Sequence, residues 1–334
     1  MSRSQDAAVL MPGLATGIGS LPYADPHVAA SATIRLHPRL PAAPQLPNPR
    51  EGVIAQWATA LPEVSVARDG TLSIDLARAA DPIVAAFDQV AHAGLLAFVD
   101  AAAGDHDIRR VKLQIVGPLT LAVALAQGGM PTSRAVARAS TAVRAWIDVL
   151  ETKLDERLPG VGRLVFLDEP SLVLWRHDRA PIERDEAVDV LSGSLAAIRG
   201  ISGVHVCGDG DVRVAFEAGP TVLGAPVSAA LLHDADVFVR HLDADGWVAW
   251  GAVPTDRPIG ESSDAPWREL VAVWCELTRR GCDPVRLRTH AIITPACGLA
   301  GFGPTQAERA LRLAREIANR VGDQAVAARL TVGA

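Results

Sequence analysis

Short apolar segments alternate with longer amphipathic segments along most of the chain, and this order limits its fold more than any other feature. Each apolar segment has the length of a β-strand and is apolar on successive residues, as in parallel strands covered on both faces. The predicted strands are 15–21, 38–46, 112–116, 163–167, 203–206, 221–227, 247–253 and 290–294. The predicted helices are 82–103, 133–158, 182–199, 229–242, 266–281 and 304–321. Eight such strands predict an α/β fold, a single (β/α)8 TIM barrel, with an open doubly wound sheet as the alternative.

The segment 62–75 departs from this alternation. It carries the turn dipeptide Asp69-Gly70 between alternating residues, a pattern typical of a β-hairpin inserted into the fold. Elsewhere no linker composition, low-complexity tract or repeat divides the 334 residues. We therefore expect residues 1–334 to form one barrel domain.

Charge and apolar patterning argue against two classes of partner. The net charge is −6, and 32 basic residues are dispersed among 38 acidic ones, so no nucleic-acid partner is expected. Glycine and glutamine interrupt the uncharged stretch 113–133, which predicts a buried strand and helix and no membrane span. No signal-peptide pattern is visible, and four scattered cysteines do not suggest a disulfide framework, so we expect a cytoplasmic protein.

Glycine, polar and sulfur-bearing residues gather directly after the predicted strands. In a parallel α/β fold the carboxyl ends of the strands surround one mouth, where ligands bind. The segments at these ends are 17–22, 117–120, 168–170, 205–208, 254–256 and 294–298. We therefore expect a shared site at this end of the barrel.

A metal site is one interpretation of the cysteines at these ends. His205 and Cys207 lie two residues apart at the end of a strand, so their side chains point to the same side. Zn²⁺ accepts imidazole and thiolate together, and Cys297 after the last strand can supply a third ligand. The alternative for all three is core packing. Cys275 and Cys282, in or just after a helix, are expected to be small buried side chains.

Asp168 and Glu169 follow a buried strand, so one carboxylate must point into the mouth while the other turns away. The inward carboxylate either binds a substrate ammonium group or caps the next loop. The glycines at 17 and 19 do not form a dinucleotide fingerprint, because Pro22 occupies the third glycine position. The glycine-rich run 298–303 either holds an anion at the following helix or is a simple turn.

Five of these motifs together resemble the C-terminal catalytic barrel of the cobalamin-independent methionine synthase family, in a short single-barrel form. They are Gly-Ile-Gly-Ser at 17–20, Gly-Pro-Leu-Thr at 117–120, Asp-Glu-Pro at 168–170, His-Val-Cys at 205–207 and Pro-Ala-Cys-Gly-Leu at 295–299. Their order and spacing agree with the family over nearly the whole chain. The resemblance implies a barrel of the methionine synthase and uroporphyrinogen decarboxylase type, in which zinc binds the thiol of homocysteine.

The resemblance also implies a role for each site residue. His205, Cys207 and Cys297 correspond to zinc ligands. Ile18, Gly19 and Ser20 correspond to the loop that holds the carboxylate of the amino acid. Asp168 corresponds to the acceptor for the ammonium group and is our candidate catalytic residue.

The chain departs from the family pattern in three ways. The family has a glutamate as a fourth zinc ligand, but segment 221–229 contains no acidic residue, and Pro226 or Ser228 stands at that place. The family has a proton-donating histidine after the seventh strand, where this chain has Pro254, Thr255 and Asp256. We expect no second barrel of the kind that the folate enzymes carry, and Leu174 or a neighbour replaces the carboxylate that contacts the pterin.

These observations predict a zinc-dependent methyltransferase that acts on a small thiol, homocysteine above all. A corrinoid methyl-donor protein is the expected donor, because the features that folate requires are missing. The alternatives are a non-catalytic paralogue that binds a metal or an amino acid, another thiol alkyltransferase, and a decarboxylase of the tetrapyrrole-processing branch. The retained His205, Cys207 and Cys297 argue against the decarboxylase.

Overall fold

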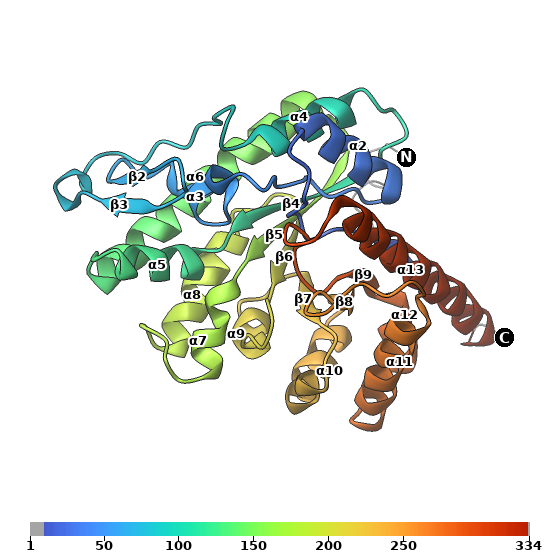
Figure 1. Ribbon diagram of the computed structural model, residues 1–334. Helices are drawn as coiled ribbons and strands as arrows, with labels where there is room; N and C mark the ends of the chain where they lie inside the picture. Colours follow the sequence, from blue (N-terminus) through green and yellow to red (C-terminus); the bar gives the residue numbers. More distant parts are fainter. Residues whose placement is uncertain (1–9, 333–334) are drawn as a thin grey trace.

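Seven parallel strands form one curled sheet in the computed structural model, which describes residues 10–332 (Figure 1). Their spatial order is β1-β9-β8-β7-β6-β5-β4, so strands that are consecutive from β4 to β9 are neighbours. The strands are β1 (Leu14–Ala15), β4 (Arg110–Val116), β5 (Gly162–Asp168), β6 (Ile201–His205), β7 (Val222–Pro226), β8 (Trp247–Val253) and β9 (Ala291–Pro295). All their pairings are parallel, which confirms the predicted α/β class.

The segment 41–45 takes the place of the eighth strand and closes the barrel. Ala42 forms a parallel bridge with Lys112 of β4, and Gln45 forms one with Ser20 just beyond β1. The backbone bonds include those from the Ala43 amide to the Lys112 carbonyl, 2.8 Å, and from the Gln45 amide to the Gly19 carbonyl, 3.0 Å. Pro41 and Pro44 cannot donate backbone hydrogen bonds, so the segment pairs only at isolated positions instead of forming a regular strand.

Helices cover the outside of the sheet (Figure 1). They are α2 (Pro26–Leu36), α3 (Ala55–Ala58), α4 (Ala93–Ala103), α5 (Pro118–Gln127), α6 (Thr132–Arg157), α7 (Val173–Arg176), α8 (Arg184–Leu195), α9 (Val212–Glu217), α10 (Ala235–Asp243), α11 (Asp264–Arg279), α12 (Pro284–Thr289) and α13 (Pro304–Val332). Short 3₁₀ turns are η1 (Pro49–Glu51), η2 (Leu76–Arg78), η3 (Pro170–Leu172) and η4 (Ala229–Asp234). Trp146, Trp250 and Trp274 are among the largest fully buried side chains of the core.

The insertion after α3 is an antiparallel pair, β2 (Val64–Val66) and β3 (Leu72–Ile74), at one edge of the molecule (Figure 1). Asp69 accepts a hydrogen bond from the Thr71 amide at 3.0 Å, and Gly70 has a φ of 83°, which favours glycine at the turn.

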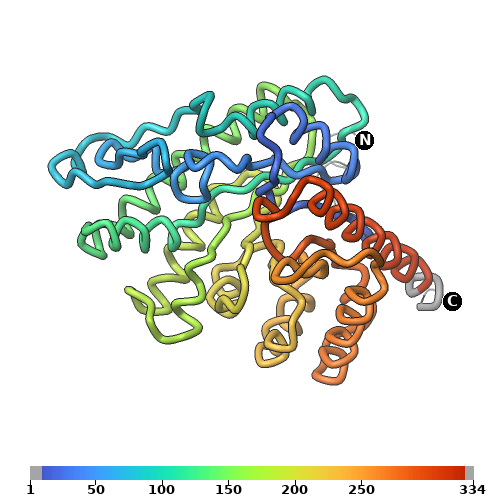
Figure 2. The backbone as a smooth tube through the Cα atoms, in the orientation of Figure 1, coloured from blue at the N-terminus to red at the C-terminus, as the bar shows by residue number. Residues whose placement is uncertain are grey.

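Two predicted elements are shorter than expected. The strand predicted at 15–21 ends at Ala15, because the glycines that follow turn the chain, with Gly19 at a φ of 147°. The helix predicted at 82–103 begins only at Ala93, and residues 82–88 run back from the hairpin without regular structure (Figure 2). Asp88 explains this start, because its carboxylate accepts hydrogen bonds from the amides of Val90 and Ala91 and forms a turn just before the helix.

The last helix is longer than the predicted 304–321. It continues through Gly322, where a glycine would be expected to end it, and reaches Val332. Gly322 packs against Gly13, and a Cβ atom on Gly13 would lie 3.0 Å from the Cα of Gly322. Gly322 therefore allows α13 to lie close to the start of the barrel and does not mark the end of the helix.

Among the described residues, no helix is both long enough and apolar enough to cross a membrane. The uncharged stretch that begins at Leu113 forms the end of β4 and the buried helix α5.

Candidate metal centre

His205, Cys207 and Cys297 come together at the carboxyl end of the barrel strands. His205 is the last residue of β6, Cys207 follows two residues later, and Cys297 follows the end of β9 by two residues. One potential ligand atom from each residue lies within 4.8 Å of those of the other two. Since β7 and β8 separate β6 from β9 in the sheet, the loop after β9 reaches across the mouth of the barrel.

The donor atoms of this cluster fit a zinc ion. Two thiols and one imidazole are typical ligands of tetrahedral Zn²⁺ sites. The Nε2 atom of His205 is buried and has no hydrogen-bond partner, although buried polar atoms are normally paired. A metal ion, or a water molecule beside it, would satisfy this nitrogen. The three residues leave one tetrahedral position for a further ligand.

The two thiols influence each other strongly. The hydrogen bond with Cys297, together with burial, raises the pKa of the Cys207 thiol. Hydrogen bonds with Cys207 and His205 lower the pKa of the Cys297 thiol. Cys297 is also the more exposed of the pair, so a nucleophilic or metal-binding thiolate faces the mouth.

Asp168 and Glu169 point to different sides of the barrel wall, as their places after a strand predict. Asp168 is the last residue of β5 and pairs in register with His205. Its side chain is buried, Oδ1 has no hydrogen-bond partner, and burial raises the pKa of the carboxyl while the charge of Lys112 opposes this shift. Glu169 is fully buried and accepts hydrogen bonds from the amides of Leu119 and Thr120, at 2.9 and 2.8 Å, and from the Thr120 hydroxyl, at 2.6 Å.

The motifs at 117–120 and 168–170 therefore form one structural unit. Glu169 lies over the first turn of α5, whose amides it pairs. Gly117 leaves the space for this carboxylate, since a Cβ atom there would lie 2.1 Å from its Oε1 atom. Of the two acids, only Asp168 has an unpartnered oxygen with which to bind a ligand.

The loop 17–20 lies beside Cys297. The Ser20 carbonyl accepts a hydrogen bond from the Leu299 amide at 2.8 Å, and the Ser20 hydroxyl donates to Gln45 at 3.1 Å. Gly298 packs so closely that a Cβ atom there would lie 2.6 Å from Oγ of Ser20. The loop proposed to hold a carboxylate and the loop with the third thiol are thus adjacent.

Three residues near the site were not predicted as site residues from the sequence. Gln45 bonds to Ser20, and Lys112 and Gln114 extend from β4 toward the loop 17–20. A signal was present in β4, where a lysine and a glutamine alternate with apolar residues and so share one face of the strand. Cys275 was predicted to be buried but is exposed, because Trp274 and Leu277 fill the inner face of α11.

No histidine, cysteine or carboxylate of the described residues joins the cluster from the positions where the chain departs from the family pattern. Ser228 and Asp256 are both exposed beyond the ends of β7 and β8. Within the described part of the chain, no additional histidine, cysteine or carboxylate joins the three clustered residues.

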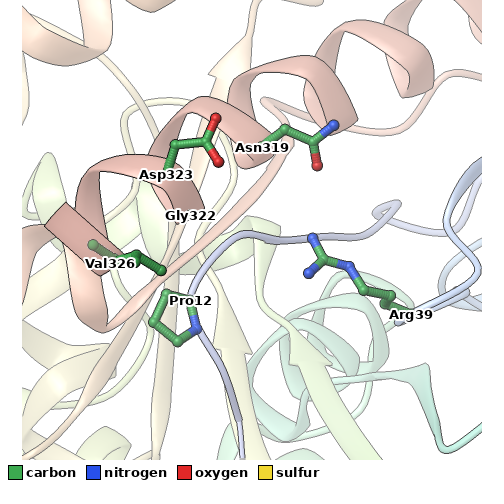
Figure 3. A pocket seen from close by; sticks show the side chains of 7 residues that line it. Pro12, Arg39, Asn319, Gly322, Asp323 and Val326 are labelled. Atoms are coloured by element: carbon green, nitrogen blue, oxygen red, sulfur yellow. The ribbon is translucent and has the colours of Figure 1, made fainter.

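A separate cavity of about 500 Å³ lies at the opposite, amino-terminal end of the barrel, between Pro12 and α13 (Figure 3). Arg39 extends toward Asn319 and Asp323 across this cavity, and its guanidinium donates a hydrogen bond to the Gly13 carbonyl. The arginine therefore stabilises the chain where it enters β1.

Comparison with known proteins supports the fold. No protein-family model and no curated protein sequence matches the chain. Among solved structures it is similar to a B12-independent methionine synthase from Shewanella sp. W3-18-1 in complex with selenomethionine. The identity is 11%, the TM-score is 0.61, and the match covers 95% of this chain and 99% of that chain. The chain has the fold of a methionine synthase.

The fold predicted from the five motifs is thus confirmed. At this identity the similarity concerns the backbone, and the chemistry of the site depends on the residues that this chain itself places at the mouth.

Proposed function

We propose that the protein transfers a methyl group to the sulfur of a small thiol, with homocysteine as the substrate. The observation that carries the proposal is the cluster of His205, Cys207 and Cys297 at the catalytic end of a barrel with the methionine synthase fold. Three soft or borderline ligands that converge from two strands are not needed for barrel packing. They suit a metal ion that binds a thiol.

Zinc held by these residues would lower the pKa of a substrate thiol bound to it, so that the thiol reacts as a thiolate at neutral pH. With zinc bound, Cys207 and Cys297 would both be thiolates, and their two negative charges would keep the sulfur of the substrate electron-rich. The position left open by the three protein ligands is where the thiol binds.

The rest of the mouth is suited to an α-amino acid. Asp168 offers a buried, unpartnered carboxylate oxygen beside His205, which can accept a hydrogen bond from an ammonium group. The loop with Ile18, Gly19 and Ser20 lies beside Cys297 and can meet the carboxylate through its backbone amides, while the Ser20 hydroxyl donates to Gln45. The two groups thus orient the amino acid while its sulfur reaches the cluster.

We propose a methylcorrinoid as the donor. Transfer from a folate leaves a nitrogen that must be protonated, which requires a general acid near the donor. Asp256 is the first acid that follows β8 along the chain, and its side chain is exposed to solvent. A corrinoid leaves without a proton, so the residues present suffice.

Cobalt substitution tests the proposed site. Metal-free protein loaded with Co²⁺ should show thiolate-to-cobalt absorption that Cys275→Ser retains and that Cys207→Ser and Cys297→Ser reduce. Adding homocysteine should strengthen the absorption, because a further thiolate binds. A cobalt spectrum that homocysteine does not change would favour the alternative of a non-catalytic metal-binding protein. That alternative is supported by the lack of a fourth clustered histidine, cysteine or carboxylate among residues 10–332.

A further inference from the structure

Lys112 is a buried cation directly behind the proposed substrate loop. It lies on the inner face of β4, its exposed fraction is 2%, and it is one of only two lysines in the chain. Moving an ammonium group out of water is costly unless its hydrogen bonds are replaced. A methionine or leucine would fill the same space without that cost, so packing alone does not explain a lysine here.

The ammonium group of Lys112 has three neighbours, all formally neutral. It donates hydrogen bonds to the Ile18 carbonyl and to Oε1 of Gln114, the latter at 3.0 Å, and lies 5.1 Å from the centre of the Phe166 ring. Burial lowers the pKa of Lys112 to about 8, and the charge of Asp168 opposes this shift. The group therefore remains largely protonated at neutral pH and keeps its hydrogens for these partners.

Gln114 packs against the same loop and bonds to the neighbouring segment 41–45. Its Nε2 atom donates a hydrogen bond to the Ala43 carbonyl at 2.9 Å. It also packs against Gly19, where a Cβ atom would lie 2.4 Å from Nε2, and the φ of 147° there is one that side chains with a Cβ rarely adopt. Lys112 thus bonds to the carbonyl of Ile18, and Gln114 packs against the next residue, Gly19.

We propose that Lys112 is a positioning residue, which holds the Ile18 carbonyl so that the following amides face the mouth and bind the carboxylate of the substrate. The inference rests on the proposed function, because it assigns the loop to a carboxylate. Lys112 itself stays behind the loop and does not contact the substrate. The proposal identifies the ligand class as thiols or thioethers that carry an α-carboxylate.

Two measurements on the Lys112→Met variant test the proposal. Hydrogen exchange of peptides that cover residues 16–21 should become at least about tenfold faster, because one charged hydrogen bond to the loop is lost. Binding of L-methionine to the zinc-loaded protein should weaken about tenfold, whereas binding of 3-(methylthio)propylamine, which lacks the carboxylate, should not change. Zinc content should equal that of the wild type.

Lys153→Met is the matched control, since Lys153 is the other lysine and also lies over a ring, 5.6 Å from the centre of Phe87. It should change neither measurement. If Lys112→Met does not fold, Gln114→Met removes the oxygen that accepts the second hydrogen bond of Lys112 and should change both measurements in the same direction.

Unchanged exchange in the loop, or an equal loss of affinity for both ligands, would overturn the positioning role while leaving the proposed function intact. Wild-type protein that does not distinguish the two ligands would overturn the carboxylate role of the loop, and with it both the proposed function and this inference.

Discussion

Buried polar and charged groups at the two ends of the barrel differ in whether they have a partner. At the amino-terminal end, Glu151 is buried, forms an ion pair with Arg163 at 2.8 Å and accepts a hydrogen bond from the Arg199 amide at 2.9 Å. At the carboxyl end, Asp168 Oδ1 and His205 Nε2 are buried without a partner. Pairing at the amino-terminal end stabilises the fold. The unpaired groups at the carboxyl end cost stability unless a ligand satisfies them.

The largest expected effect is on metal binding at the carboxyl end. Cys207→Ser and Cys297→Ser should each lose most of the bound zinc, because a tetrahedral site with three protein ligands cannot spare one. The free energy of unfolding of the metal-free protein should change little. Metal analysis after purification without chelators measures the zinc content, and denaturant unfolding measures the free energy of unfolding.

Cys275→Ser is the control, since this exposed cysteine lies on α11, away from the cluster. Full zinc occupancy in both cluster variants would identify Cys207 and Cys297 as packing residues and would remove the difference between the two ends.

At the amino-terminal end, a substitution should act on stability and spare the metal. Glu151→Ala should lower the free energy of unfolding by about 1–3 kcal/mol, because the Arg199 amide loses its buried acceptor and Arg163 keeps only Asp155 as an ion-pair partner. Asp155→Ala, which removes a half-exposed partner of the same arginine, should cost about 0–1 kcal/mol. Denaturant unfolding compares the two, and a loss of zinc in Glu151→Ala would show that the ends are coupled.

His37 should make stability depend on pH. It lies just before the segment 41–45, its Nε2 pairs with the Leu311 carbonyl at 2.8 Å, and burial lowers its pKa to about 4. Because the unfolded ring binds a proton near pH 6.5 and the folded ring does not, stability should fall between pH 6.5 and 4, by up to about 1.4 kcal/mol per pH unit.

His37→Gln can keep the hydrogen bond but does not titrate, so its unfolding free energy should depend less on pH over that range. Equal slopes for the two proteins would mean that His37 binds a proton in the folded state and that this buried site is less enclosed than described.

The smallest expected effect concerns ligand binding at Asp168. Asp168→Asn should weaken L-methionine by about tenfold to a hundredfold, since a charge-assisted hydrogen bond is worth roughly 1.5–3 kcal/mol. Zinc content should stay the same. Calorimetry with L-methionine and with 4-(methylthio)butanoate, which lacks the ammonium group, measures the effect, and equal wild-type affinities for these ligands would contradict the assignment.

Much of the barrel could be predicted because its strands from β4 to β9 are continuous apolar runs. The predictions that differ from the structure lie where single residues determine whether a strand or helix can form. Pro41 and Pro44 reduce the strand predicted at 38–46 to isolated bridges. Asp88 forms a turn, so α4 begins later than predicted although residues 83–87 are apolar. The cluster of His205, Cys207 and Cys297 was predicted from their places at strand ends. Lys112 and Gln114 were not predicted, although they alternate with apolar residues in β4, because the sequence does not identify the backbone carbonyls to which they bond.

The central claim is that the unpaired groups at the carboxyl end serve methyl transfer to a thiol. The most direct measurement supplies zinc-replete protein with homocysteine and isotopically labelled methyl donors, namely methylcobalamin and methyltetrahydrofolate with one or several glutamates, and detects labelled methionine. We expect labelled methionine from methylcobalamin and little or none from the folates. Robust turnover with a folate would contradict the proposed donor, and no methionine with any of these donors would contradict the claim itself.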